Sequence, residues 1–300
     1  MFGVTILGNN SAIPSNDRHP TSQVVTIDDQ LLLLDCGEGT QMQFNRYKIK
    51  RSKISYIFIS HLHGDHYFGL IGLITSMGLL NRLDDLHIFG PAELKNIIEI
   101  QLDAAAIILP FHLTFHPLTE TGIIVDEKKF TVSCFPAQHR IECWGFVIRE
   151  KKNPRKIDLT KVADREIPKS YYEELKKGHD YTTKEGVTIP NHELTIENTP
   201  CKSYAFCADT RYDESILPFI EHVTLLYHET TYLKDQTERA FERYHSTTHQ
   251  AATIALKANV HRLIIGHFSS KYDNLSFFLN EAKEVFPHTA LALEGTTFKL

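Results

Sequence analysis

Four potential metal ligands lie within six consecutive residues, directly after an apolar segment. Residues 55–60 read Ser-Tyr-Ile-Phe-Ile-Ser, and residues 61–66 read His-Leu-His-Gly-Asp-His. Because α/β folds place functional residues at the carboxyl ends of strands, we expect this cluster at the end of a strand. Gly64 would allow a tight turn, so that His61 and His63 converge on one ion while Asp65 and His66 face another. The spacing therefore predicts two adjacent metal ions.

The types of donor atom indicate the metal. Imidazole nitrogen and carboxylate oxygen without thiolate sulfur favour Zn²⁺, with Mn²⁺ or Fe²⁺ as alternatives. The absence of Cys ligands is typical of a catalytic site and not of a closed structural one. The chain holds 17 His and a single Trp, which also directs attention to metal chemistry. The alternative is that unrelated surface histidines cluster by chance.

Short apolar runs bounded by Gly, Asp and Pro predict the strands that position these residues. The clearest runs are residues 4–7, 23–27, 31–34, 55–59 and 263–266. Residues 248–258 have a helical pattern in which Ala251, Ile254, Ala255 and Ala258 share one face. We therefore expect mixed sheets covered by helices.

Length and composition exclude several classes of protein. The 300 residues fit one large α/β domain, and 42% hydrophobic with 23% charged residues excludes a disordered chain, a collagen or a coiled coil. The formal net charge of −5 gives no global basic excess for nucleic acid, so such a partner must bind a local patch. No run approaches the roughly 18 apolar residues of a membrane span, and the first residues are expected to form a strand and not a signal peptide.

The cysteines indicate the compartment. There are five, an odd count, and none of them forms a C-x-x-C motif. This usage fits free buried thiols in a reducing compartment better than a disulfide framework, so the cytoplasm is the expected location.

A basic segment precedes the strand that leads to the histidine cluster. Five of the eight residues from 46 to 53 are basic, and no acidic residue occurs between Glu38 and Asp65. Such a segment can bind backbone phosphates without regard to sequence. The RNA-binding candidates are Arg46, Lys48, Lys50, Arg51 and Lys53. A solvated basic face is the alternative.

The composition changes over residues 149–197. This stretch is polar, with few apolar runs and with prolines at 154, 168 and 190. We interpret it as an insertion into a single domain of residues 1–300. A plain surface elaboration remains an alternative.

The motif His61-Leu62-His63-Gly64-Asp65-His66 resembles the H-x-H-x-D-H signature of the metallo-β-lactamase superfamily. Other segments, spread over nearly the whole chain, resemble its ribonuclease Z family of tRNA 3′-processing endonucleases. These segments are Leu7-Gly8 with the Pro14 loop, Asp35-Cys36-Gly37-Glu38-Gly39-Thr40-Gln41, Cys207-Ala208-Asp209-Thr210, His228-Glu229-Thr230, His245-Ser246-Thr247 and His267-Phe268-Ser269-Ser270-Lys271-Tyr272.

The resemblance implies an αββα sandwich, in which two mixed sheets pack face to face with helices outside. It also implies the remaining ligands. His139 would join His61 and His63 on the first ion, His267 would join Asp65 and His66 on the second, and Asp209 would bridge both. Asp35 would support the ligands through hydrogen bonds. Taken singly, a histidine such as His139 or His267 is more often one that binds no metal, but together with the motif both are expected to be ligands.

The family's reaction is hydrolysis of a phosphodiester by water activated between two zinc ions roughly 3.5–4 Å apart. Asp65 would hold this water and accept its proton. His245, oriented by Glu229, would donate a proton to the leaving ribose oxygen. The alternative is that His245 only packs against the helix that begins near residue 246.

The resemblance further implies precursor tRNA as a partner, a homodimer, and an arm that grips tRNA. Residues 149–197 lie where the family has this arm, which makes them a candidate tRNA exosite, but they lack the adjacent Gly-Pro pair that is typical of it. Two other functions remain open. One is a general metal-dependent phosphodiesterase, or another hydrolase of the superfamily, acting on a small anionic substrate. The other is a non-catalytic RNA-binding subunit.

Overall fold

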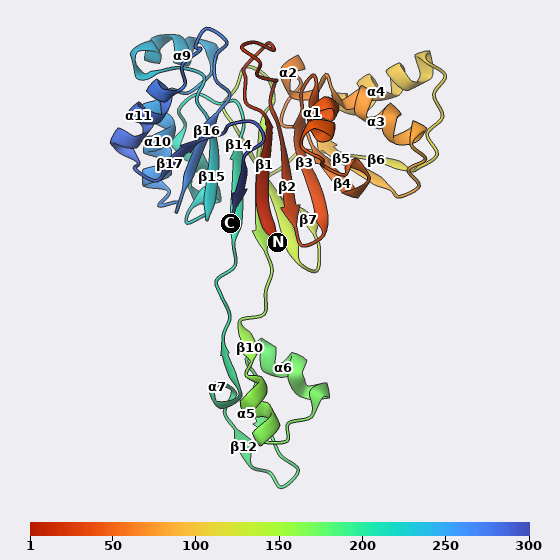
Figure 1. Cartoon of the computed structure of the whole chain (residues 1–300), viewed down its shortest axis with the longest axis vertical. Coiled ribbons are helices and arrows are strands. Elements are labelled where there is room, and N and C mark those ends of the chain that lie inside the picture. The colour runs from red at the N-terminus through yellow and green to blue at the C-terminus, as the bar shows by residue number, and fades with distance from the viewer. The chain divides into compact units, whose positions relative to one another are not determined.

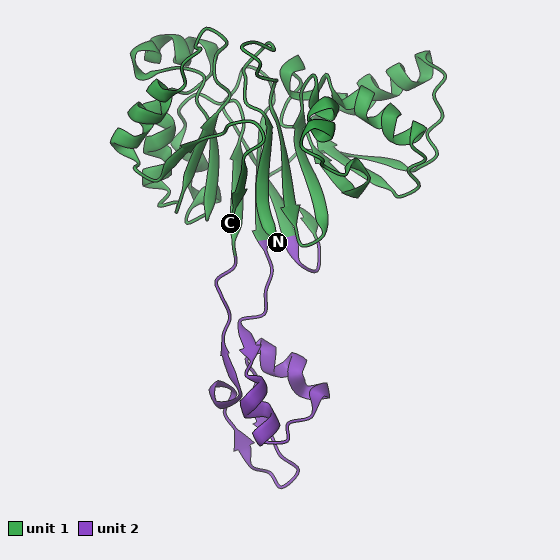
Figure 2. Ribbon diagram, in the orientation of Figure 1, with its two compact units in different colours: residues 1–126, 131–149, 202–300 green, residues 127–130, 150–201 purple.

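Two seven-stranded sheets make up most of the larger of two units into which the chain divides (Figure 2). The computed structural model describes residues 1–300. Unit 1 comprises Met1–Asp126, Thr131–Arg149 and Lys202–Leu300, and unit 2 comprises Glu127–Phe130 and Glu150–Cys201. No helix is long and apolar enough to cross a membrane.

The first sheet of unit 1 contains the strand that leads to the histidine cluster. In spatial order its strands are β18 (Thr297–Lys299), β1 (Phe2–Gly8), β2 (Ser22–Ile27), β3 (Gln30–Cys36), β4 (Ile54–Phe58), β5 (Leu86–Gly90) and β6 (Leu113–Pro117). Strands β1 to β3 pair antiparallel, whereas β3 to β6 pair parallel and are therefore joined by helical crossovers. These crossovers contain α1 (Thr40–Arg46), the 3₁₀ turn η1 (Arg51–Lys53), α2 (Gly64–Tyr67), α3 (Leu70–Leu79) and α4 (Glu93–Ala104).

The second sheet has the same number of strands. In spatial order they are β17 (Thr289–Leu291), β16 (Leu263–Gly266), β15 (Leu225–Glu229), β14 (Ser203–Cys207), β9 (Trp144–Glu150), β8 (Phe130–Pro136) and β7 (Gly122–Asp126). Strands β14 to β17 pair parallel. Their crossovers contain η3 (Glu214–Ile216), α8 (Leu217–Ile220), η4 (Lys234–Gln236), α9 (Thr237–Arg243), α10 (Thr248–Lys257) and α11 (Ser276–Val285).

The two sheets face each other, and the helices cover their outer faces (Figure 1). Between the sheets, the rings of Phe58 and Phe146 lie 5.3 Å apart, and the Tyr204 hydroxyl donates to Gln23 Oε1. Helix α3 buries Leu70, Leu73, Ile74 and Met77 against the first sheet. The predicted αββα sandwich of two mixed sheets is confirmed.

Helix α10 illustrates how the sequence determines an element. Thr247 and Gln250 form a capping box, in which each side chain bonds the backbone N–H of the other residue. The face predicted from the sequence, Ala251, Ile254, Ala255 and Ala258, is buried, and the last three residues belong to the core against the second sheet. The predicted strands also coincide with β1, β2, β3, β4 and β16, with ends that differ by at most two residues.

Unit 2 contains the polar insertion but has a core of its own. It consists of β10 (Arg155–Ile157), α5 (Leu159–Asp164), η2 (Lys169–Tyr171), α6 (Tyr172–Lys177), β11 (Tyr181–Thr182), β12 (Thr188–Ile189), α7 (Asn191–Leu194) and β13 (Thr195–Glu197). Its buried apolar residues are Val162, Ile167, Leu175, Ile189 and Leu194. The composition gave little sign of this core, because these residues are isolated among charged ones and meet only in the fold.

The core of unit 2 predicts a local unfolding phenotype. Leu175 is fully buried, so Leu175→Ala should destabilise unit 2 by about 2–5 kcal/mol through lost burial and a residual cavity. Limited proteolysis should then cut the variant within residues 150–201 faster than the wild type, while residues 1–126 stay protected. Leu159→Ala, at a position 72% exposed, is the control and should be cut at the wild-type rate. Equal cleavage of both variants would contradict a separate core.

Candidate active site

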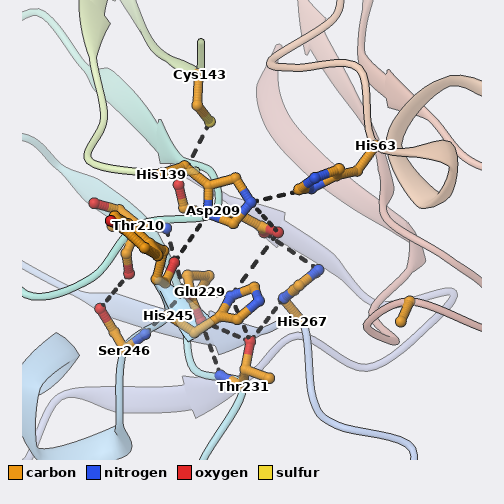
Figure 3. A network of polar contacts seen from close by, with 12 residues as sticks. His63, His139, Cys143, Asp209, Thr210, Glu229, Thr231, His245, Ser246 and His267 are labelled. Atoms are coloured by element: carbon orange, nitrogen blue, oxygen red, sulfur yellow. Dashed lines mark hydrogen bonds and ion pairs between the residues drawn. The ribbon is translucent and has the colours of Figure 1, made fainter. Parts of the chain in front are cut away.

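The predicted metal ligands follow the carboxyl ends of four strands, five of them in loops and Asp65 and His66 in α2. Figure 3 shows four of them, His63, His139, Asp209 and His267. The motif of residues 61–66 follows β4 of the first sheet. His139 follows β8, Asp209 follows β14 and His267 follows β16, all in the second sheet. The site thus lies where the two sheets present the same edge, as expected for the ends of parallel strands.

The first group of ligands is His61, His63, His139 and Asp209, whose potential donor atoms all lie within 4.8 Å of one another. His63 Nδ1 lies 3.1 Å from His61 Nε2 and 3.0 Å from His139 Nε2. Asp209 Oδ2 lies 3.7 Å from His61 Nε2 and 3.9 Å from His139 Nε2. These atoms point toward one central position.

The second group is Asp65, His66 and His267. Asp65 Oδ2 lies 3.5 Å from His66 Nε2 and 3.4 Å from His267 Nε2. The other oxygen of Asp209, Oδ1, lies 3.5 Å from His66 Nε2 and 3.2 Å from His267 Nε2. Asp209 therefore faces both groups, one oxygen to each, and the structure brings all seven predicted ligands together.

The imidazole tautomers fit a metal site. His66 Nδ1 donates to Asp35 (2.6 Å), and His139 Nδ1 donates to the Tyr244 carbonyl (2.9 Å). His267 Nδ1 lies 2.9 Å from the Thr231 hydroxyl, which itself donates to Glu229 and so accepts from the ring. In each ring Nδ1 has an acceptor outside the cluster, so Nε2 is the nitrogen that faces into the cluster.

Two buried atoms of the cluster lack hydrogen-bond partners. His66 Nε2 and Asp209 Oδ1 are both inaccessible to solvent and make no hydrogen bond. Unpartnered buried polar atoms are costly, and a cation between them would satisfy both. The residues present therefore fit divalent metal ions.

The electrostatics differ between the ligands: burial would lower the pKa of His66, but the carboxylates of Asp209 and Asp65 outweigh burial and raise it well above its usual value. Burial, followed by repulsion from His139, lowers the pKa of His63 to about 4. Burial by itself would raise the pKa of Asp209, but the charges of His267 and His66 hold it well below its usual value. At neutral pH the site thus offers an ionised carboxylate and a neutral His63 imidazole, as metal binding requires.

Asp35 supports the cluster through hydrogen bonds. Besides accepting from His66, it accepts the backbone N–H and the hydroxyl of Ser60, at 2.7 and 2.9 Å. Asp35 has a φ of 54°, a left-handed conformation that is strained for a residue with a side chain. The hydrogen bonds place Asp35 in the supporting position predicted from the sequence.

His245 lies beside the cluster and is held by Glu229. Its Nδ1 is 3.0 Å from Glu229 Oε1 and 3.2 Å from the Thr231 hydroxyl. Burial would lower the pKa of His245, but the carboxylates of Glu229 and Asp209 outweigh burial and raise it to about 9. A protonated imidazole at this position can donate a proton.

Gly64 is required for a reason other than the predicted bend. Its φ is not in the left-handed region, but a Cβ at this position would lie 2.2 Å from the ring of Phe68. The expectation that backbone freedom at Gly64 allows the convergence of the ligands was wrong, because close packing against Phe68 excludes a side chain here.

The cluster opens into a cleft of about 480 Å³. The loop of residues 9–20 forms one wall, and its Ala12 N–H donates to Asp65 Oδ2 at 2.7 Å. Gly8 allows this loop to return close to β1, since a Cβ there would lie 1.7 Å from the Pro20 carbonyl oxygen. The remaining wall includes Glu38, Phe68 and Arg140.

The predicted RNA-binding residues lie elsewhere on unit 1. Arg46 ends α1, and Lys48, Lys50, Arg51 and Lys53 follow it. Four of them line two other clefts, of about 560 and 310 Å³, and none lines the cleft at the metal cluster. Their binding to RNA stays a prediction.

The sequence analysis missed Thr231, Ser60 and the carbonyl of Tyr244, which orient the ligands. Thr231 directly follows the His228-Glu229-Thr230 motif and Ser60 directly precedes His61, so adjacency to a motif could have indicated both. A backbone carbonyl carries no sequence signal, so the role of Tyr244 depended on the fold.

Comparisons with known proteins agree with this geometry. Residues 2–283, which include the whole cluster, match the family model described as anti-Pycsar protein Apyc1. The ribonuclease Z of Bacteroides thetaiotaomicron is 43% identical over 98% of this chain and 94% of its own length, and that of Bacteroides fragilis is 42% identical over 100% and 99%. The crystal structure of human tRNase Z, short form, has a TM-score of 0.74 at 26% identity and covers 99% of this chain and 98% of its own.

The family match and the relatives both extend over nearly the full length, and the metal-ligand geometry is complete. The chain therefore belongs to the family that the matching model describes, and its relatives place it among the ribonuclease Z proteins, the metal-dependent endonucleases that process the 3′ end of tRNA.

Proposed function

We propose that this protein is a zinc-dependent endoribonuclease that removes the 3′ trailer from precursor tRNA. The observation that supports the proposal is the position of the Asp209 carboxylate between the two groups of ligands. One of its oxygens faces the group of three imidazoles, and the other faces the group of two imidazoles and the Asp65 carboxylate. This donor set suits two Zn²⁺ ions per chain, with Mn²⁺ or Fe²⁺ as alternatives. The ligands are His61, His63, His139 and Asp209 for one ion, and Asp65, His66, His267 and Asp209 for the other.

Two such ions would supply Lewis acidity, activating water and neutralising the charge of the phosphodiester. Two residues of the chain then carry out one proton transfer each. Asp65, oriented by the Ala12 N–H, accepts the proton of the attacking water. His245, oriented by Glu229, donates a proton to the leaving ribose oxygen. The leaving oxygen ends as a hydroxyl, and the attacked phosphorus ends as a phosphate monoester on the other fragment.

The RNA body would be bound away from the cleft. In unit 2, Lys176 and Lys177 are paired with Glu173 and Glu174, but Lys156, Lys169 and Lys184 form no ion pair and are free for phosphates. These charges support residues 149–197 as the tRNA exosite. The basic segment of residues 46–53 is the second proposed contact.

We also propose a homodimer in the cytoplasm. Leu79, Leu80 and Leu83 are 64–84% exposed next to the cleft of about 560 Å³, an apolar surface of the kind that subunit interfaces cover. Four of the five cysteines are buried and all five are unpaired, which suits a reducing compartment.

The bridging role of Asp209 predicts metal loss. Asp209→Ala should lower the bound metal from about two ions to less than one per chain, because both groups lose a shared charged ligand. Mass spectrometry of the metals in purified, dialysed protein measures this. His112→Ala removes an exposed histidine outside the cluster and should keep wild-type content. Two ions retained by the Asp209 variant would refute the bridge.

The proposed role of His245 predicts a rate loss without metal loss. His245→Ala should slow precursor cleavage by about 10²–10⁴-fold, the usual contribution of a general acid. Single-turnover kinetics and metal content should be measured together. If His245→Ala lost metal, His245 would be a ligand; if turnover were unchanged, it would have no part in the reaction.

The exosite assignment predicts a change in substrate preference. Arg149 and Ser203 are paired neighbours in antiparallel strands β9 and β14, so a short hairpin turn can replace residues 151–201. The variant should cleave precursor tRNA roughly 100-fold less efficiently, as losing about two charge-assisted contacts of ~1.5 kcal/mol each would give. Hydrolysis of a small chromogenic phosphodiester should persist, and parallel loss of both activities would contradict the assignment.

A further inference from the structure

The guanidinium group of Arg211 is stacked against two aromatic rings beside the metal cluster. Its Cζ lies 5.0 Å from the ring centre of Phe241, in α9, and 4.6 Å from that of Tyr244, just after α9. Cation–π contacts of this kind hold the plane of an arginine in one orientation. The orientation of Arg211 is therefore fixed before any ligand binds.

These residues are connected to the ligands through the backbone. Arg211 lies two residues after Asp209, and its N–H donates to the carbonyl of Gln138, the neighbour of His139. Tyr244 directly precedes His245, and its carbonyl accepts from His139 Nδ1 at 2.9 Å. Arg211 and Tyr244 are thus held in a fixed position relative to the reacting groups.

The N–H groups of the Arg211 guanidinium have no partner within the chain. Its guanidinium makes no hydrogen bond or ion pair. Arg82 differs, since its guanidinium donates to the carbonyls of Asp84 and Asp85, both at 2.7 Å. An arginine with an ordered plane and free N–H donors is suited to a phosphate, which accepts two parallel hydrogen bonds.

Phe241, which stacks against Arg211, also has an exposed aromatic ring. Its side chain is 60% exposed, although a large apolar group gains by being covered. An exposed aromatic ring beside a free arginine is the combination by which proteins bind single-stranded nucleotides, through base stacking and a phosphate contact.

Other cations lie near His245. The ring of Tyr232 lies 6.1 Å from that of His245, and Lys271 and Arg239 lie over Tyr232 at 5.4 and 5.8 Å. Arg140 lines the cleft itself. Several cationic side chains thus lie near His245, although the formal net charge of the chain is −5.

We propose that Arg211, Phe241 and Tyr244 form the subsite for the nucleotide that carries the leaving oxygen. The assignment to this side follows from Tyr244, which directly precedes the proposed proton donor His245. The Phe241 ring stacks on the base of this nucleotide, Arg211 binds a phosphate adjacent to the scissile one, and Tyr244 holds the guanidinium in place. This inference rests on the proposed endonuclease function.

The test uses the full chain with its metals and compares two substrates. The readout is the ratio of kcat/KM for a precursor tRNA to kcat/KM for a small chromogenic phosphodiester, which corrects for altered metal content. Phe241→Ala and Arg211→Ala should each lower this ratio roughly 5- to 150-fold, the range for loss of one stacked base. Phe241→Trp should restore it, and Arg211→Lys should restore it only in part, because an ammonium lacks the planar edge.

Phe277→Ala is the matched control, since Phe277 is 56% exposed on α11, and its ratio should equal that of the wild type. Precursors with an abasic residue on either side of the scissile bond identify the nucleotide. The abasic residue on the fragment that ends in a hydroxyl should lower the wild-type ratio, and Phe241→Ala should add no further loss on that substrate.

Several outcomes would overturn the inference. Ratios of the Phe241 and Arg211 variants equal to that of Phe277→Ala would remove the subsite and leave the endonuclease function intact. Fully additive losses from Phe241→Ala and the abasic residue would show that the ring does not touch that base. A wild-type protein that hydrolysed the small ester but never cleaved the precursor would refute the proposed function and this inference with it.

Discussion

The carboxylate of Asp209 faces imidazole nitrogens on both of its sides, and its Oδ1 has no hydrogen-bond partner. The other ligands are arranged around this single buried charge. Each of the two ligand groups combines residues from both sheets: His61 and His63 meet His139, and Asp65 and His66 meet His267. No sheet holds a complete set, so metal binding would stabilise the packing of one sheet on the other.

The surroundings of the cluster determine which imidazole nitrogen faces inward. Asp35, Thr231 and the Tyr244 carbonyl each accept the Nδ1 proton of one ligand. The chain tolerates backbone strain to hold this arrangement, since Asp35 and His267 both have φ near 60°, at about 1–3 kcal/mol each. Such strain persists because Asp35 lies in β3 and His267 directly follows β16, and each of these strands is paired with a neighbour on both sides. The polar network thus presents the ligands preoriented for a cation.

We assign the hydrolysis and the selection of the substrate to different parts of the chain. The cluster holds the groups proposed for the chemistry. We assign the selection of RNA to features outside it, namely the stack around Arg211, the basic segment after α1, and Lys156, Lys169 and Lys184 of unit 2. This division explains how a chain of net negative charge can act on a polyanion: the positive groups are local, and the excess of acidic residues lies elsewhere.

The sequence by itself determined the elements and the chemistry. Periodicity located β1 to β4, β16 and α10, because burial on one or both faces leaves a pattern that is local in the chain. The spacing of residues 61–66 indicated a metal site, since four donors in six residues are rare without one. Resemblance to a known family then supplied His139, Asp209 and His267, which no local pattern distinguishes from other His and Asp residues.

Only the tertiary structure decided what depends on contacts between distant segments. The core of unit 2 forms from apolar residues that are isolated in the sequence, and Arg211 meets Phe241 only because the fold brings the loop after β14 to α9. Gly64 was correctly singled out, but the reason, the ring of Phe68, was visible only in the packed structure. Local sequence encodes backbone preference and donor type, whereas the partner of a side chain is set by the fold as a whole.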